Sequence, residues 1–176
     1  LFAVLAGSIA VILMPDEYWA RMQSIGEYQE DQSSQGRLEM WNAAINVASS
    51  YITGGGFDLY RSPQFLAFIR TIPRSAHSVY FQALGEHGWI GLGLLLTFWG
   101  SIFLQSRRAA KELAAIPGTE NMRLLMLMTQ VSLVGFAVGG AFVNIGYWDF
   151  PFDIALGVLA VRRLVASGAL QQDAAA

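Results

Sequence analysis

The stretch Ala-His-Ser-Val-Tyr-Phe-Gln-Ala-Leu-Gly-Glu-His-Gly, residues 76–88, joins a long polar segment to a long apolar one. The apolar segment continues to about position 105, which is longer than one membrane span requires, so a break is expected near Gly88. The pattern predicts a short helix over 77–87 and a membrane helix over 89–104. Polar side chains at a membrane boundary are costly to keep without a use, so the functional site is expected here.

The composition is typical of a membrane protein. Hydrophobic residues make up 54% of the 176 residues and charged residues only 14%, against about 25% charged residues in an average soluble domain. The formal net charge of −2 gives no reason to expect a nucleic-acid partner. The sequence has no cysteine and only two histidines, and no carboxylate cluster at ligand spacing, so neither a metal site nor a cofactor is expected.

Three further apolar segments complete a predicted all-α, polytopic membrane protein with about four transmembrane helices. Residues 1–14 would be about 21 Å long as a helix, shorter than the roughly 30 Å hydrocarbon core, and indicate a truncated transmembrane helix. Residues 124–142 are the next predicted span, and 150–161 are a short final span that contains Asp153. The sequence is therefore expected to be the C-terminal part of a longer polytopic protein.

The positive-inside rule gives the predicted orientation. A short loop at 105–123 holds Arg107, Arg108, Lys111 and Arg123 and is expected in the cytoplasm. The long loop is then on the periplasmic side, where it carries the functional motifs on short helices. The predicted parts are a truncated helix at 1–14, the periplasmic loop at 15–87, transmembrane helices at 88–166 and a disordered tail at 167–176.

Two helical pieces are expected in the periplasmic loop. Ser34 is a candidate N-cap for a helix over 37–50, which the triplet Gly54-Gly55-Gly56 ends. Residues 64–71 form an amphipathic piece, whose apolar side chains, Phe65 among them, are expected to face lipid or the membrane domain.

Arginines supply every cation of the loop after position 15 and are the candidate anion-binding residues. A planar guanidinium matches phosphate geometry. Arg37 and Trp41 lie four residues apart, either as a surface stacking pair or as an anion-binding arginine held by an aromatic ring. The other candidate substrate-binding arginines are Arg61, Arg70 and Arg74.

Arg70, Arg74 and His77 fall within eight residues, although Pro73 makes a shared helical face doubtful. They are either contacts to lipid headgroups or a basic pocket for a pyrophosphate, with His77 as proton acceptor or orienting group.

Four more residues complete the candidate binding set. Gly54 and Gly56 let backbone N–H groups approach an anion, although glycine triplets usually only turn a chain. On a straight helix His77 and Tyr80 share one side, whereas Glu86 lies nearly opposite His77. A direct pair between His77 and Glu86 is therefore not expected, and Glu86 is expected to hold the loop together.

Taken in order, these residues resemble the O-antigen ligase and O-antigen polymerase superfamily of bacterial membrane proteins. The resemblance rests on residues 34–41 (SQGRLEMW), 54–57 (GGGF) and 76–88, which lie within a stretch of 55 residues. Tyr51 stands about where the family usually has a proline before its Gly-x-Gly turn. The serine after His77 looks most like a sub-branch associated with exosortase systems, whose members are regarded as O-glycosylation ligases.

The resemblance implies an inverting, metal-independent glycosyl transfer at the periplasmic face of the bacterial inner membrane. The implied donor is a glycan on undecaprenyl pyrophosphate. The implied acceptor is a lipid A core sugar or a protein hydroxyl for a ligase, and another lipid-linked repeat for a polymerase. The family's essential histidine corresponds to His77 and its loop arginine to Arg37.

This chemistry suits the candidate residues. Arg37, with Arg74 and Arg70, would stabilise the charge on a departing pyrophosphate without a metal, and His77 would activate the acceptor hydroxyl. Two alternatives remain open. One is a transporter of lipid-linked glycans, which would place its key polar groups mid-membrane, at Thr129, Gln130 and Asp153; the other is a non-catalytic membrane scaffold.

Overall fold

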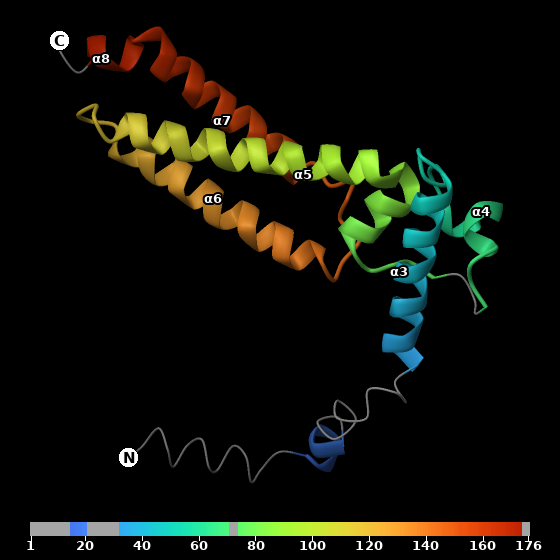
Figure 1. The fold of residues 1–176 in the computed structure, drawn as a ribbon. Helices are drawn as coiled ribbons and strands as arrows, with labels where there is room; N and C mark the ends of the chain where they lie inside the picture. The colour runs from blue at the N-terminus through green and yellow to red at the C-terminus, as the bar shows by residue number, and fades with distance from the viewer. Residues whose placement is uncertain (1–14, 21–31, 71–73, 174–176) are drawn as a thin grey trace.

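The computed structural model describes residues 15–20, 32–70 and 74–173, and in these ranges the chain is helical with no strand, as predicted. Figure 1 shows the three long helices after residue 78 lying alongside one another, with the elements that precede them at one end and the short C-terminal helix at the other. The elements are α3 (Gln32–Ser50), the 3-10 helix η1 (Leu59–Arg61), α4 (Pro63–Leu66), α5 (Val79–Leu113), α6 (Glu120–Gly140), α7 (Phe150–Ser167) and α8 (Ala169–Asp173).

Helices α5 and α6 form an antiparallel hairpin, and α7 returns along α5 (Figure 1). Their shared core includes Val79, Trp99, Met126, Leu133 and Val158, all buried. The short connection between α5 and α6 is tied to the end of α5 by the Thr119 hydroxyl, which shares its proton between the carbonyls of Leu113, at 2.7 Å, and Ile116, at 2.8 Å.

The predicted cytoplasmic loop at 105–123 is wrong in extent. Helix α5 continues to Leu113 and α6 begins at Glu120. The basic residues that were expected to mark a loop are good helix formers, so they prolong the helix past its apolar part.

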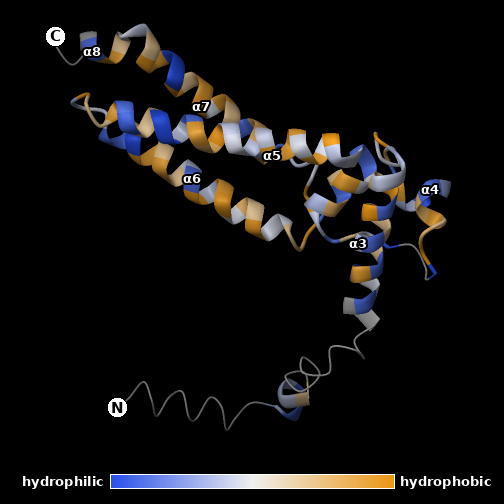
Figure 2. Cartoon of the chain, in the orientation of Figure 1, coloured by the Kyte–Doolittle hydropathy of each residue, from blue (hydrophilic) through white to orange (hydrophobic). Residues whose placement is uncertain are grey.

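Two helices, α5 and α6, are long and apolar enough to cross a membrane. Their large apolar side chains face outward: Leu94 is 67% exposed and Val131 is 64% exposed. Figure 2 shows hydrophobic residues along both helices and hydrophilic residues near the connection between them. An apolar exterior is what a lipid solvent requires, so these helices indicate a membrane protein.

Four spans stay a prediction. Helix α7 has 18 residues and carries Asp153, Arg162 and Arg163. The first predicted span, 1–14, lies outside the described residues. The predicted tail also differs, because α8 is a short helix over Ala169–Asp173 where disorder was expected.

Helix α3 stands at the N-terminal end of α5 and buries one side in a second, smaller core (Figure 1). Met40, Ala43 and Val47 recur at helical spacing and pack on Leu59 and Phe65. Two predictions are corrected here. The helix begins at Gln32, two residues before the predicted N-cap Ser34. Helix α4 has only four residues, and its Phe65 is buried in this second core, so it faces neither lipid nor the core of α5, α6 and α7.

The predicted break lies at Gly88, where φ is 68° and ψ is −170°, a conformation that is essentially restricted to glycine. The turn at Gly54-Gly55-Gly56, the glycine turn, packs directly on this break. The N–H groups of Gly55 and Gly56 donate to the carbonyls of Gly85, at 2.7 Å, and Glu86, at 3.0 Å. The turn therefore fixes α3 against the first part of α5.

Candidate functional site

His77 lies between α4 and α5 in the left-handed backbone region, with φ of 47°. A non-glycine residue in this region stores about 1–2 kcal/mol of strain and persists only when its surroundings hold it there. The helix begins two residues later, at Val79, so the prediction that His77 and Tyr80 share a helix face is wrong.

Side chains from α3 and η1 hold the residue before His77. The indole N–H of Trp41 donates to the Ala76 carbonyl at 2.8 Å. The Ala76 N–H donates to the Tyr60 hydroxyl at 3.0 Å. Burial raises the pKa of Tyr60, so its hydroxyl stays protonated at neutral pH. Both backbone groups of Ala76 are thus fixed by side chains distant in sequence.

Asn144, in the connection between α6 and α7, holds both sides of His77. Its amide oxygen accepts from the Ser78 N–H at 2.9 Å, and its amide nitrogen donates to the Ser75 hydroxyl. That hydroxyl also accepts from the His77 N–H at 3.3 Å. One side chain therefore links the residues that flank the strained histidine.

The histidine segment and the start of α3 form a small pocket, the arginine–histidine pocket, with a volume of about 60 Å³. Arg37, Arg74 and His77 line it and are exposed, so the predicted residues meet across 40 positions of sequence. In the described part of the chain neither arginine forms an ion pair, and no carboxylate lines the pocket. The lining is completed by Gly36 and Ser75.

The other two candidate arginines do not line this pocket. Arg61 pairs with Asp58 across 3.6 Å. The backbone N–H of Arg70 donates to the Glu39 carboxylate at 2.7 Å, which ties α4's exit to α3. Of the four candidate arginines, only Arg37 and Arg74 line this pocket.

Two aromatic residues that were predicted to bind substrate, Trp41 and Tyr80, contact neighbouring helices. Trp41 stacks on Phe81, with ring centroids 4.6 Å apart and an angle of 9°, so it supports the histidine segment instead of forming the predicted stack with Arg37. The Tyr80 hydroxyl donates to the Ala137 carbonyl at 2.6 Å and so joins α5 to α6. Neither lines the arginine–histidine pocket.

Glu86 joins the start of α5 to the connection between α6 and α7, whereas the predicted role in holding the loop at 15–87 together stays a prediction. Glu86 is 4% exposed and accepts a hydrogen bond from the Tyr147 hydroxyl, which also lies 3.2 Å from the His87 ring nitrogen. Burial and the hydrogen bond to Glu86 raise the pKa of Tyr147 above its usual value, so this phenol remains a donor. The Phe57 ring lies edge-on to His87, with centroids 4.9 Å apart, so the glycine turn joins this cluster.

Gly54 and Gly56 belong to the glycine turn that packs on the first part of α5. Their N–H groups donate to the carbonyls of Tyr51, at 2.9 Å, and Glu86, at 3.0 Å. These donors are therefore engaged within the chain, and the predicted direct contact with an anion has no free N–H at these two glycines.

A larger space, the apolar cavity, lies between α5 and α7 and has a volume of about 680 Å³. Its walls include Leu94, Phe98 and Phe152, and its polar end includes Glu86 and His87. Gln82 is also in the lining, and its amide oxygen is buried without a hydrogen-bond partner in the described part of the chain. The apolar cavity shares no residue with the arginine–histidine pocket.

Two of the polar groups that the transporter alternative would use bond to their own helix. The Thr129 hydroxyl and the Gln130 amide each donate to carbonyls four residues back in α6, at 2.9 and 3.1 Å. Because Gln130 also lines a cavity, these bonds do not decide the transporter alternative.

Sequence reasoning missed Asn144 and Tyr147. Both lie more than 60 positions from their partners, and an asparagine or tyrosine in a turn with interfacial aromatics has no spacing that would single it out.

Comparison with known proteins gives one match. The family model described as O-antigen ligase matches residues 1–96, which is more than half of the chain and includes Arg37, Arg74 and His77. No curated protein and no solved structure matches the chain. The chain belongs to the O-antigen ligase family.

Proposed function

We propose that the protein transfers a glycan from undecaprenyl pyrophosphate to an acceptor hydroxyl, either on a lipid A core or on a protein, at the periplasmic face of the bacterial inner membrane. The proposal rests on one observation: Arg37, Arg74 and His77 line one exposed pocket in which no described residue is a carboxylate, although 40 positions separate the first from the last. Family membership supports the reaction class.

The two arginines suit the leaving group. As the bond between the anomeric carbon and the pyrophosphate oxygen breaks, the electron pair and a negative charge pass to the pyrophosphate. Fixed guanidinium groups stabilise this developing charge, and each can offer two parallel N–H donors. No ion pair competes for Arg37 or Arg74 within the described residues.

His77 suits the acceptor. A neutral imidazole accepts the proton of the acceptor hydroxyl while its oxygen attacks the anomeric carbon, and attack opposite the leaving group inverts the configuration. The left-handed backbone and the bonds to Ala76, Ser75 and Ser78 support a fixed position for the ring.

The apolar cavity gives the carrier's isoprenoid chain a place to lie. Its apolar walls are on α5 and α7, where apolar side chains such as Leu94 are exposed, and its polar end reaches Glu86 beside the glycine turn. A pocket for the charged head and a separate apolar space for the tail fit an amphiphilic donor.

The test uses the full-length gene in a strain that lacks it, with wild type beside His77→Ala, and resolves lipid-linked glycans and modified acceptors by size. We expect the variant to accumulate long lipid-linked chains and to leave the acceptor bare. Single repeats alone on the carrier would instead identify a polymerase. Wild-type glycans in the variant would contradict any role for His77.

The matched control is Arg61→Ala, because Arg61 is an exposed loop arginine outside the pocket and pairs only locally with Asp58. We expect Arg61→Ala to keep at least a third of wild-type transfer, and Arg37→Ala to lose at least tenfold, which is about 1.4 kcal/mol of barrier.

A further inference from the structure

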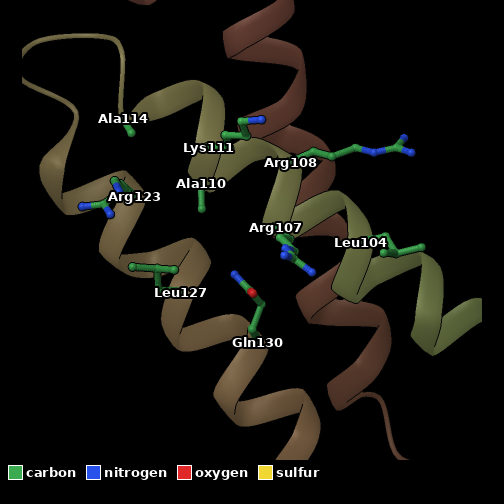
Figure 3. A pocket seen from close by; sticks show the side chains of 9 residues that line it. All are labelled: Leu104, Arg107, Arg108, Ala110, Lys111, Ala114, Arg123, Leu127 and Gln130. Carbon is green, nitrogen blue, oxygen red and sulfur yellow. The ribbon is translucent and has the colours of Figure 1, made fainter.

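A second basic cavity, drawn in Figure 3, lies between the C-terminal part of α5 and the N-terminal part of α6. Its volume is about 660 Å³, and we call it the distal basic cavity. The lining residues are Leu104, Arg107, Arg108, Ala110, Lys111, Ala114, Arg123, Leu127 and Gln130. Four of these nine are cations, and they come from both helices.

The four cations have no counter-charge of their own. Within the described residues none of them forms an ion pair, and no carboxylate lines the cavity. Glu112, the acid next to Lys111 in sequence, is engaged elsewhere: both its oxygens accept from the Arg162 guanidinium, at 2.6 and 2.5 Å. The electrostatics therefore favour an anion from outside the chain.

The lining of the cavity combines cationic and apolar side chains, which suits an amphiphilic ligand. Figure 3 shows Arg107 and Gln130 turned toward each other across the space between α5 and α6, while Arg108 extends away from α6. Leu104 and Leu127 line the same space with aliphatic carbon. An arginine fork beside an apolar wall matches a phosphate that is attached to acyl chains.

The position of the cavity along α5 matches the level at which a lipid headgroup lies in a bilayer. At 1.5 Å per residue, Arg107 and Lys111 lie about 27 and 33 Å along α5 from Trp89, which directly follows the break at Gly88. A bilayer's hydrocarbon core is about 30 Å thick. If the exposed Trp89 marks one interface, the cations lie at the phosphate level of the opposite leaflet.

We infer that the distal basic cavity binds the headgroup of an anionic phospholipid, with its phosphate between Arg107 on α5 and Arg123 on α6. This site is separate from the proposed transfer reaction and needs only that α5 and α6 span the membrane.

The experiment titrates the purified full-length protein, in a nonionic detergent, with phosphatidylglycerol, and follows the thermal unfolding midpoint to obtain an apparent affinity. Phosphatidylcholine and free sn-glycerol 3-phosphate are the comparison probes at matched concentration. We expect phosphatidylglycerol to bind at least tenfold more tightly than either. Equal binding of phosphatidylcholine, or equal binding of free glycerol phosphate, would overturn the proposal.

Variants locate the site. Arg107→Gln and Arg123→Gln should each weaken phosphatidylglycerol binding at least fivefold, and the double variant more. The control Arg163→Gln removes the same charge from an exposed position of α7 outside the cavity and should leave affinity within twofold. An equal loss in Arg163→Gln would mean that only net charge matters. Unchanged affinity in the double variant would also refute the site, and the lipid comparison on wild type decides the question even if that variant unfolds.

Discussion

His77 owes its position to residues that are far away in the sequence. Its φ of 47° is held by Trp41, Tyr60 and Asn144, which come from three different parts of the chain. Asn144 is the most consequential, because it bonds on both sides of the histidine. We regard it as a positioning residue, since it acts on the segment and does not line the arginine–histidine pocket.

Replacing Asn144 should therefore affect turnover more than binding. We expect Asn144→Ala to lower kcat at least tenfold with KM changed less than threefold, because the ring is misplaced while the arginines remain. Asn144→Asp keeps the acceptor for the Ser78 N–H and loses the donor to the Ser75 hydroxyl, so its kcat should lie between that of wild type and that of Asn144→Ala. Steady-state kinetics on a defined lipid-linked donor checks this, with the exposed Asn121→Ala as control. Equal kcat in Asn144→Ala and wild type would contradict the role.

Tyr147 gives a prediction about alkaline pH. Its pKa is raised in the folded protein from the ordinary 10.0, so the folded state holds its proton more tightly than the unfolded state does. The resulting stability is complete below pH about 10 and is lost as the pH rises through the folded-state pKa. We expect the unfolding midpoint of wild type to fall more steeply than that of Tyr147→Phe as the pH rises above about 10. Parallel curves for the two proteins would refute the raised pKa of this phenol.

At this scale the sequence predicted Arg37, Arg74 and His77, because their residue types suit a pyrophosphate and an acceptor proton. It did not separate Arg74 from Arg61 and Arg70, since only the fold shows which arginines meet in one pocket. The helix-based reasoning about Tyr80 failed because α5 begins after His77, not at it.

At the scale of elements, the contact between the glycine turn and α5 holds α3 against the start of α5 and so positions the candidate site. A Cβ on Gly88 would lie 2.4 Å from the Ile52 carbonyl oxygen, and a Cβ on Gly54 would lie 2.6 Å from the Gly85 carbonyl oxygen. Both contacts are with backbone, which cannot move aside without separating α3 from α5. The sequence predicted the turn and the break, but their mutual contact depends on packing that no local pattern encodes.

Gly88→Ala should accordingly destabilise the protein by at least about 2 kcal/mol, through backbone strain and the clash together. Gly93→Ala is the matched control, because it lies in the same helix and its added Cβ would meet nothing within 4 Å. That control should be neutral or slightly stabilising, since alanine favours helix. Thermal unfolding in detergent measures both, and equal midpoints for the two variants would contradict the account of the break.

At the scale of the whole molecule, the protein has two chemically different ends separated by apolar helices. The arginine–histidine pocket and the Glu86–Tyr147 cluster lie where α3 and the glycine turn meet α5, and the distal basic cavity lies near the other end of the hairpin. The apolar runs predicted the helices well. The extension of α5 to Leu113 was not predicted, because charged residues were taken as the end of the helix and not only as the end of its apolar part.

The central claim is that Arg37 and His77 act together in one transfer step. The most direct measurement is a double-mutant cycle on kcat/KM with a defined lipid-linked donor, using Arg37→Ala, His77→Ala and the double variant. The account predicts at least a tenfold loss in each single variant, and a double variant that is far less impaired than the product of the two losses. Losses below tenfold in both single variants, or losses that multiply fully, would contradict a shared site.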